Sequence, residues 1–438
     1  MNRQAIYESN PAIRPNPQFS WSRRQWLTWV SGAVATGCGG HRIQEHPNLK
    51  GYAPPSSGVP GTVIAHSPKS SGLYIGSPSL AVLSNGDYVA SHDFFGPASK
   101  EFEQARSRLF RSSNHGRSWE QVAEIQGAFW SSLFVHREKL YLLGLDRHHG
   151  RVLIRRSEDG GDHWTDPKDS KTGVLRTEPE YHCAPVPVLE HAGRLWRAFE
   201  WRNPPEAWGI HYRAGVLSAP VDADLLDAEQ WTSSQFLPSE RSWNAGDMGA
   251  WLEGNVVVGP DGNLMDLLRV DTRACPEKAA LVRIQPDGRT MQFDPSNGFV
   301  DFPGGAKKFT VRFDPKSRLY WSLSSIVPSG WETAAKPARI RNTLALVASP
   351  NLRDWSVRCC LLHHPDHQHV GFQYVDWLFE GQDIIAICRT AFEDGQGGAH
   401  NAHDANFLTF HRVSGFRQRK PADSVPVTRH LPPAGSTA

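Results

Sequence analysis

Charged side chains recur at one point of a repeated pattern in this sequence, where the apolar strand that follows a polar turn comes to its end. Counting seven or nine residues from each turn reaches most of them. Charges at the ends of apolar strands need water, an ion partner or a ligand. These residues are therefore either solvated one by one at a rim or gathered in one polar central site. Their number and recurrence favour the polar central site. The set comprises Asp93, Glu200, Arg202, Arg269, Asp271 and, within a residue or two of the same strand end, Arg147 and Arg389, and in one repeat the same count reaches the uncharged Ser324.

The strands that precede these turns carry further reactive side chains. Glu253 lies early in the otherwise apolar stretch "WLEGNVVV", and His182 lies early in "YHCAPVPV". Tyr374 and Asp376 are two residues apart in "GFQYVDWLF". Because successive side chains of a strand point to opposite faces, this spacing predicts that both lie on the same face.

A glycine-rich loop near the end of the chain, "GGAHNAHDANFLTF", gathers His400, His403 and Asp404. Two histidines and an aspartate could hold a metal. Loops rich in histidine and asparagine are more often hydrogen-bonding surfaces, however. We therefore predict that His403 and Asp404 bind substrate and that the protein uses neither a metal nor another cofactor.

Paired carboxylates flanked by tryptophans and arginines suit the chemistry of sugars. One carboxylic acid can protonate the leaving oxygen of a glycosidic bond while a second group attacks the sugar or activates water. Arginine binds carboxylates through two parallel N–H donors, which favours an acidic sugar (sialic, uronic or sulfated) as ligand. The predicted partner is therefore a glycan. A net charge of only +2 gives no electrostatic case for nucleic acid.

These residues sit on six copies of one pattern, each a strand, a short polar turn and a second strand, which is typical of a β-hairpin. A third strand follows each hairpin, and four of these end on a tryptophan. The spacing lies in the range of propeller blades. We expect an all-β, six-bladed β-propeller with four-stranded antiparallel blades, in which the strand Gly61–Ser67 completes the last blade and closes the ring. The hairpins span residues 77–96, 130–147, 183–202, 252–271, 307–325 and 372–390.

Two of the later turns, "SSNHGRSW" and "SEDGGDHW", resemble the Asp-box of the bacterial neuraminidase repeat. In that box an acidic or amide side chain bonds turn amides, glycine takes a positive φ and tryptophan packs on the strands. "SPNLRDW" and "SAPVDADLLDAEQW" look like degenerate copies. The resemblance implies a structural role on the rim of the blades for Asn114, Gly116, Trp119, Asp159, Gly161, Trp164, Trp231 and Trp355.

The resemblance to sialidase-like propellers also implies catalytic roles. In sialidases a tyrosine assisted by a glutamate is the nucleophile, an aspartate is the acid-base group and three arginines hold the carboxylate of the sugar. Carried over, Tyr374 with Glu253 would be nucleophile and helper, and Asp93 the acid-base group. The chain departs from the family in having "LYIGSPSL" where the Phe/Tyr-Arg-Ile-Pro motif would fall. The predicted substrate-binding residues are Arg202, Arg269 and Arg389 as the clamp, with Glu200, Asp271, Asp376, His182, His403 and Asp404.

Three functions fit this pattern. The first is a glycoside hydrolase acting on an acidic or decorated glycan. The second is a polysaccharide lyase, which would use Tyr374 with His182 or His403 as base and acid beside an arginine that neutralises a uronate. The third is a carbohydrate-binding propeller without turnover. Loss of binding or turnover in Glu253→Gln would support an enzyme that uses Glu253. Unchanged binding and turnover would show that the enzymatic role assigned to this residue is wrong.

The first 38 residues resemble an export signal rather than part of the fold. "SRRQWLTWVSGAVATGC" has paired arginines, Arg23 and Arg24, followed by an aromatic residue and a leucine, as in twin-arginine signals. Cys38 ends the run after small residues, as in a lipobox, where the cysteine is lipidated. We expect export to the periplasm or cell surface, with membrane attachment only through such a lipid.

The remaining chain divides by composition. Residues 39–60 are rich in proline, glycine and serine and predict a flexible linker before a propeller at 61–415. Residues 416–438 are polar and proline-rich, which predicts a disordered tail. The five cysteines after Cys38 show no CxxC spacing, so neither a disulfide framework nor a structural zinc site is expected. We expect a monomer.

Overall fold

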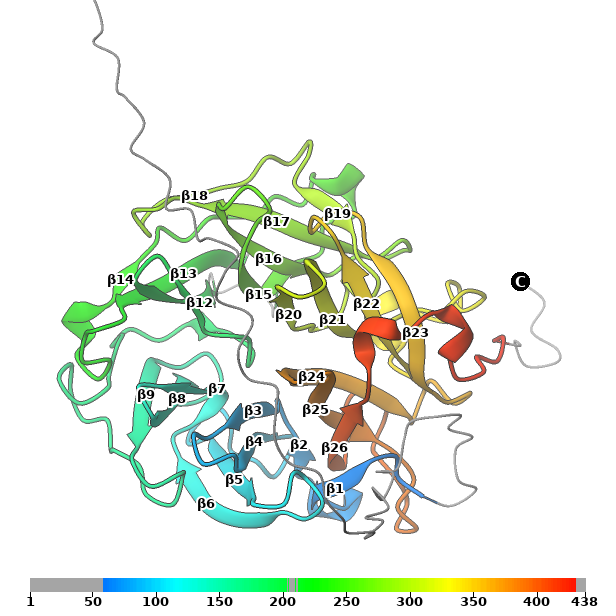
Figure 1. The fold of residues 1–438 in the computed structure, drawn as a ribbon, viewed down its shortest axis with the longest axis horizontal. Helices are drawn as coiled ribbons and strands as arrows, with labels where there is room; N and C mark the ends of the chain where they lie inside the picture. The colour runs from blue at the N-terminus through cyan, green and yellow to red at the C-terminus, as the bar shows by residue number, and fades with distance from the viewer. Residues whose placement is uncertain (1–57, 203, 205–208, 210–211, 431–438) are drawn as a thin grey trace, which may run out of the picture. The chain divides into compact units, whose positions relative to one another are not determined.

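A computed structural model describes residues 58–202, 204, 209 and 212–430. These residues form six antiparallel sheets set around a ring, which confirms the all-β, six-bladed propeller (Figure 1). The predicted export signal with Cys38, and nearly all of the predicted linker, lie outside the described residues. No helix in the described part of the chain is long and apolar enough to cross a membrane.

Each blade follows the order of the chain, with its first strand innermost. Blade 1 has β2 (Tyr74–Ile75), β3 (Ser79–Val82), β4 (Tyr88–Phe95), β5 (Arg106–Ser112) and β6 (Glu120–Gln126). Blade 2 has β7 (Phe129–His136), β8 (Lys139–Leu145) and β9 (Val152–Ser157). Blade 3 has β10 (Tyr181–His182), β11 (Leu189–His191), β12 (Arg194–Trp201), β13 (Arg213–Pro220) and β14 (Thr232–Ser233).

The second half of the ring continues in the same way. Blade 4 has β15 (Trp251–Val258), β16 (Leu264–Val270), β17 (Lys278–Ile284), β18 (Met291–Gln292) and β19 (Phe299–Asp301). Blade 5 has β20 (Val311–Asp314), β21 (Leu319–Ser325), β22 (Thr343–Ser349) and β23 (Ser356–His363). Blade 6 has β24 (Gly371–Glu380), β25 (Asp383–Ala391), β26 (Phe407–Val413) and β1 (Thr62–His66). The short 3₁₀ helices of the described chain are Lys69–Ser71, Ala228–Gln230, Asn244–Gly246, Pro337–Arg339, Phe416–Gln418 and Pro421–Asp423.

The ring closes through the N-terminal strand, as predicted. β1 pairs with β26 from Thr62 opposite Phe410 to His66 opposite Phe407, so the first and last strands of the ring share one blade. Strand number differs from the uniform four that we expected. In the described chain the sheets have between three and five strands, because the innermost strands of blades 1 and 3 are broken in two and blade 2 lacks a fourth strand.

Apolar side chains fill the spaces between neighbouring blades. Trp196 and Val216 of blade 3, for example, pack in one buried cluster with Trp251 and Leu268 of blade 4. Both faces of a blade are covered in this way. Inner strands such as β8 and β25 therefore read as largely apolar runs, and burial of these faces stabilises the ring.

The best copies of the box form the turn that the resemblance implies. Asp159 Oδ1 accepts the backbone N–H of His163 at 2.9 Å, and Gly161, with φ of 107°, donates its N–H to Ser157 Oγ at 2.9 Å. The Trp164 indole N–H donates to the Gly161 carbonyl at 2.8 Å. Asn114 and Gly116 make the same two backbone bonds after β5, and Trp119 packs in the cluster between blades 6 and 1.

The degenerate copies keep the tryptophan and lose part of the turn. The Trp355 indole N–H donates to the Leu352 carbonyl at 2.9 Å, three residues back, as Trp164 does. Trp231 reaches the Leu225 carbonyl at 3.0 Å across a longer loop. In all four copies the tryptophan lies at the corner that follows the third strand of its blade.

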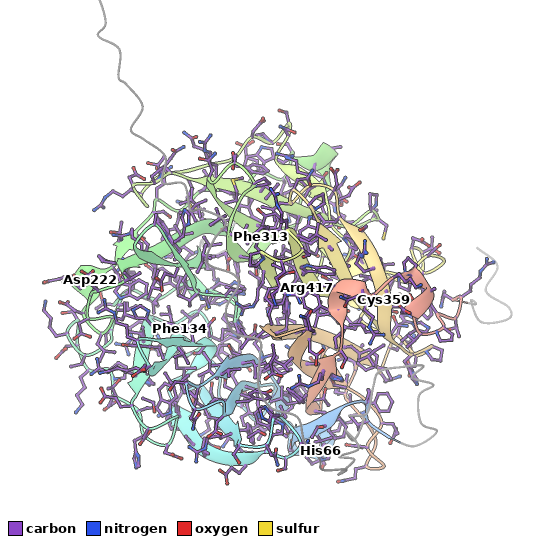
Figure 2. All side chains as sticks on the ribbon, in the orientation of Figure 1. His66, Phe134, Asp222, Phe313, Cys359 and Arg417 are labelled. Atoms are coloured by element: carbon purple, nitrogen blue, oxygen red, sulfur yellow. The ribbon has the colours of Figure 1, made fainter. Side chains whose placement is uncertain are left out.

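The prediction of a disordered tail is wrong for residues 416–430. Phe416 is buried in the cluster between blades 5 and 6, and the neighbouring Arg417 (Figure 2) binds both carboxylate oxygens of Asp314, at 2.6 and 2.8 Å. The Trp331 indole donates to the Thr428 carbonyl at 2.8 Å. A polar, proline-rich composition does not prevent a segment from binding in this way when single aromatic and charged anchors fit the blade beneath it.

Candidate active site

The centre of the candidate site is a trio of hydrogen-bonded side chains, one from blade 6 and two from blade 4. The Tyr374 hydroxyl on β24 donates to Glu253 Oε1 on β15 at 3.0 Å, and Arg269 Nη1 on β16 donates to Glu253 Oε2 at 2.8 Å. All three side chains are buried. Burial disfavours the charge of Glu253, but Arg269 and His182 together outweigh it and lower the pKa of Glu253 below its usual value. Burial and the nearby Glu253 raise the pKa of Tyr374.

A β-bulge aims each of the two central side chains. The pairing of β15 with β16 skips from Leu252 to Asn255, and Glu253 between them has φ of 58°. The pairing of β24 with β25 skips in the same way around Tyr374, whose φ is 53°. A positive φ is strained for a residue with a side chain, so the surrounding contacts must hold both bulges in place.

The bulge in β24 makes the prediction that Tyr374 and Asp376 share a face wrong. An extra residue breaks the alternation of the strand. Asp376 Oδ2 instead accepts from the Ser79 hydroxyl at 3.1 Å and from the Leu80 N–H at 2.8 Å, which joins blade 6 to blade 1. The carboxylate therefore ties two blades together and lines neither cavity beside Tyr374.

Three arginines surround Tyr374. The guanidinium carbon of Arg389 lies 4.7 Å from the centre of the tyrosine ring, that of Arg341 lies 5.9 Å away, and Arg269 is linked through Glu253. Arg341 Nη1 donates to Gln373 Oε1, and Arg389 Nη2 donates to the His403 carbonyl at 2.6 Å. Burial lowers the pKa of Arg341 to about 10, so the group stays charged near neutral pH.

Of the predicted clamp, Arg269 and Arg389 lie beside Tyr374 and Arg202 does not. Arg202 bonds to Glu180 at 3.2 Å and is not among the described residues that line the cavities beside Tyr374. The third arginine beside Tyr374 is Arg341. A count that starts from the hairpin turns does not reach Arg341, because this residue precedes β22, the third strand of blade 5.

Asp93 lies at the end of β4 in a cavity of about 320 Å³ that Tyr374 and Arg389 also line. Its carboxylate accepts the backbone N–H of Ser77 at 2.8 Å and that of Trp130 at 2.6 Å. Burial outweighs these bonds and raises the pKa of Asp93 to about 7. A carboxyl group with such a pKa can give and take a proton near neutral pH.

Glu200 and His182 form a buried pair behind the trio. His182 Nδ1 and Glu200 Oε2 are 2.7 Å apart, and Glu200 Oε1 accepts the backbone N–H of Gly254 at 3.1 Å. Gly254 belongs to the bulge that carries Glu253. Glu200, predicted to bind substrate, is thus placed to hold the bulge in position.

The remaining predicted residues border a larger cavity of about 860 Å³ on the same side of the ring. Asp271, His403 and Asp404 line it with Tyr374 and Arg341. His403 Nδ1 and Asp404 Oδ1 are 2.7 Å apart, and burial and the charge of Arg389 lower the pKa of His403 to about 3. No group of three or more histidine, cysteine or acidic side chains suited to a metal ion occurs among the described residues.

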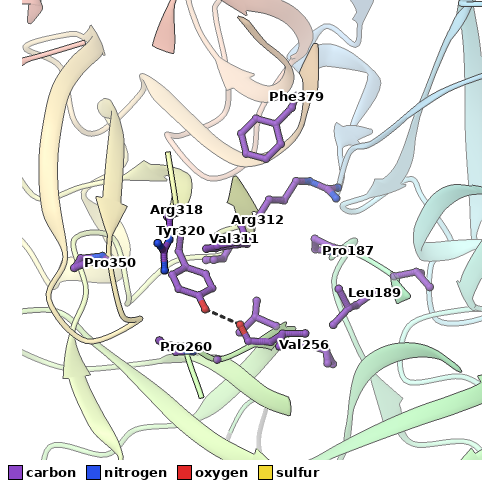
Figure 3. Close-up of a pocket in the computed structure, with 15 residues that line it drawn as sticks. Pro187, Leu189, Val256, Pro260, Val311, Arg312, Arg318, Tyr320, Pro350 and Phe379 are labelled. Atoms are coloured by element: carbon purple, nitrogen blue, oxygen red, sulfur yellow. Dashed lines mark hydrogen bonds between the residues drawn. The ribbon is translucent and has the colours of Figure 1, made fainter. Parts of the chain in front are cut away.

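An apolar cavity of about 540 Å³ opens where the innermost strands end, at the hairpin turns (Figure 3). Its lining includes Val256, Val311 and Phe379, and the Tyr320 hydroxyl is bonded to the Val258 carbonyl at 2.7 Å. No carboxylate of the described chain lines this cavity. The groups able to transfer protons lie instead at the end of the ring where Tyr374 is found.

The sequence matches no protein-family model and no curated protein. Solved structures do resemble the chain. A Hadza microbial sialidase, Hz136, is 13% identical with a TM-score of 0.56 over 81% of this chain and 68% of that one. A Trypanosoma rangeli sialidase in complex with sialic acid is 14% identical with a TM-score of 0.52 over 84% of this chain and 57% of that one. A Penicillium chrysogenum α-L-arabinanase is 12% identical with a TM-score of 0.51 over 83% of this chain and 99% of that one.

Structural similarity at such low sequence identity establishes the fold alone. The activity has to be argued from the site. Sialidases and an arabinanase share the ring with this chain, and their named substrates differ. The described chain therefore has the sialidase-like six-bladed β-propeller fold.

Proposed function

We propose that this protein is a glycoside hydrolase that cleaves an acidic sugar from a glycan with Tyr374 as nucleophile. The observation that carries the proposal is the bond of 3.0 Å between the Tyr374 hydroxyl and Glu253, inside a group of three arginines. A tyrosine is a weak nucleophile until a base takes its proton. Glu253 is ionised, buried and already bonded to that proton.

The two chemical steps balance with the groups present. In the first, Tyr374 Oη attacks the anomeric carbon, its proton passes to Glu253, and Asp93 gives a proton to the leaving oxygen as the glycosidic bond breaks. In the second, Asp93 takes a proton from water, the water oxygen attacks the anomeric carbon, and the tyrosine leaves and recovers its proton from Glu253. Two displacements retain the configuration of the sugar.

The arginines set the class of sugar. Of the three buried guanidinium groups around the nucleophile, Arg269 forms an ion pair with Glu253. Neither of the other two forms an ion pair with a carboxylate of the described chain, which leaves their N–H donors for a ligand. A carboxylate on the sugar would accept parallel N–H bonds from such groups. We therefore expect sialosides or uronides to be cleaved and neutral glycosides to be poor substrates.

A fluorinated glycosyl fluoride tests the nucleophile directly. We would first screen aryl sialosides, aryl uronides and sulfated aryl glycosides for release of the aryl group. The matching fluorinated glycosyl fluoride should then add one sugar mass to the peptide that carries Tyr374, and Tyr374→Phe should show no adduct. Cleavage without any adduct at Tyr374 would disprove this mechanism.

A lyase is the second candidate, and the position of His403 favours it. Its ring centre lies 6.4 Å from that of Tyr374, and its low pKa keeps the imidazole neutral. A tyrosine and a neutral histidine beside arginines could abstract a proton next to a uronate and expel the leaving group. Ultraviolet absorbance of an unsaturated product from a polyuronate would establish the lyase, and binding of glycans without any product would establish the third alternative, a binding propeller.

We also propose that the chain is exported by the twin-arginine route and anchored through a lipid on Cys38. The proposal rests on the motif that begins at Ser22. In a bacterial host, replacing Arg23 and Arg24 by lysine should keep the protein in the cytoplasm. Cys38→Ala should release an exported protein from the membrane fraction, and unchanged fractionation of both variants would refute the proposal.

We also expect the protein to be a monomer. Analytical ultracentrifugation should show a single sedimenting species of about the monomer mass.

A further inference from the structure

The bulges that carry Glu253 and Tyr374 have a third counterpart. In the described chain, the innermost strands of blades 2, 4 and 6 each skip two residues in their pairing with the second strand. In β7 the skip runs from Phe129 to Ser132, and its first residue, Trp130, has φ of 48°. Glu253 and Tyr374 hold the same place in their strands, with φ of 58° and 53°.

A left-handed backbone is unusual for a tryptophan. Bulky residues pay for this conformation in strain, and such strain gathers at functional sites, where neighbouring contacts hold it. Two of the three equivalent positions carry the proposed nucleophile and its helper. The third is therefore a candidate for a direct role at the same site.

The contacts of Trp130 place it beside the proposed acid. Its backbone N–H donates to Asp93 Oδ2 at 2.6 Å, and its side chain lines the cavity of about 320 Å³ that Asp93 and Tyr374 share. The indole is half-buried, with the rings of His148 and His182 both centred 4.5 Å away. Of the three arginines around Tyr374, only Arg389 also lines this cavity, whereas Arg269 and Arg341 line the larger cavity of about 860 Å³.

We propose that Trp130 is the platform on which the sugar on the leaving-group side rests, and that this sugar is neutral. The inference builds on the proposed function. Asp93 protonates the leaving oxygen, so the ring attached to that oxygen must lie next to the residue bonded to Asp93. An indole face packs well against the C–H face of a pyranose. The acidic ring then lies among the arginines, and the substrate is an acidic sugar linked to a neutral one.

Two substitutions at Trp130 make the test specific. Trp130→Gly removes the ring and relieves the positive φ, since glycine adopts this conformation without strain. Trp130→Phe keeps an aromatic face and is the matched control. Each would be made in the Tyr374→Phe background to prevent turnover, and thermal unfolding would check that the variants fold.

Saturation-transfer NMR reports which ring of a bound disaccharide touches the protein. The probes are 3′-sialyllactose and a glucuronate–N-acetylhexosamine disaccharide, each with one acidic and one neutral ring. We expect transfer to both rings for Trp130→Phe, and transfer to the acidic ring alone for Trp130→Gly. Equal transfer to the neutral ring in both variants would overturn the platform while leaving the proposed function intact.

Kinetics of Trp130 variants that keep the tyrosine at position 374 distinguish failure of the platform from failure of the proposed function. Trp130→Gly should lower kcat/KM about 3- to 10-fold on the disaccharide that is cleaved. It should leave hydrolysis of the methyl glycoside of the same acidic sugar unchanged, because methanol needs the proton of Asp93 to leave but has no ring to rest on the indole. An equal loss on both substrates would show that Trp130 only supports Asp93. Absence of binding and cleavage with every probe would refute the proposed function and this inference together.

Discussion

The Tyr374 hydroxyl and the Glu253 carboxylate lie 3.0 Å apart although 121 residues separate them in the chain. β24 and β15 belong to blades 6 and 4, and each side chain reaches the other from a bulge in its strand. Arg269 binds the other oxygen of the same carboxylate at 2.8 Å. This geometry keeps Glu253 ionised and ready to accept a proton, and it makes the pair the most informative place for substitution.

Glu253→Gln should lower kcat about 100- to 10,000-fold, because the amide cannot take the proton of Tyr374. The arginines proposed to bind the substrate remain, so KM should change little. Loss of the buried charge pair with Arg269 should also lower the free energy of unfolding by about 1–3 kcal/mol. Initial rates and chemical denaturation measure the two effects.

The matched control for this loss of stability is Asp314→Asn, which breaks the Asp314–Arg417 ion pair at the end of β20. It should lower the free energy of unfolding to a similar degree and leave kcat unchanged. Equal losses of kcat in the two variants would mean that Glu253 acts only through stability.

Asp93 predicts how activity depends on pH. Its pKa of about 7 means that the protonated acid needed for the first step disappears above neutrality, so kcat/KM should fall as the pH rises through 7. Asp93→Asn should remove this alkaline limb along with most of the activity on poor leaving groups. A profile whose alkaline limb survives in Asp93→Asn would assign the proton to another group.

The same pKa affects stability, with a sign that follows from linkage. The folded-state pKa of about 7 exceeds the 3.8 of the unfolded chain, so the folded protein binds more protons between these values. The contribution of Asp93 is therefore fully present below pH 3.8 and is lost as the pH rises to about 7. Denaturation of the wild type and Asp93→Asn at pH 5 and pH 8 would show the difference.

Much of the fold followed from alternation and turn chemistry, because both are local. Six hairpins and their tryptophan corners predicted the ring and its closure by β1. The central site followed in part, since strand ends converge in a propeller. The predictions that failed depended on features that a periodic sequence pattern does not show. A bulge turned Asp376 away from Tyr374, and Arg341 entered from a strand that the count did not include.

The C-terminal tail also shows a limit of prediction from the sequence. Composition alone predicted disorder there, but a few specific contacts decide whether a polar segment binds. Phe416 and Arg417 each meet a partner that lies more than 30 residues away in the sequence, on the blade beneath. A pairing of this kind becomes visible only once the blades are in place.

Arg341 and Arg202 offer a paired test of which arginine binds the acidic sugar. Arg341→Gln should raise KM for the cleaved acidic glycoside about 10- to 100-fold, as expected for losing a hydrogen bond between charged groups. Arg202→Gln, which affects the bond to Glu180 and lies outside both cavities beside Tyr374, should change KM less than about 3-fold. The methyl ester of the same substrate should be cleaved equally poorly by the wild type and Arg341→Gln. The opposite ranking of the two arginines would restore the clamp predicted from the sequence.

Arg417 predicts a loss of stability at acidic pH that leaves catalysis alone. Its guanidinium, the largest influence on Asp314, holds the pKa of that carboxyl well below its usual value. A depressed folded-state pKa gives stability that is present above the unfolded pKa of 3.8 and is lost as the pH falls further.

Arg417→Met should therefore lower the free energy of unfolding by about 1–3 kcal/mol at pH 7 and by less near pH 2, which lies below the unfolded pKa of 3.8. Chemical denaturation at the two pH values measures the change, and kcat at pH 7 should match the wild type because the pair lies at the hairpin end of β20. A deficit that is the same at both pH values would show that Arg417 acts by packing on Phe416, whose ring centre lies 4.3 Å from its guanidinium carbon, and not through its charge.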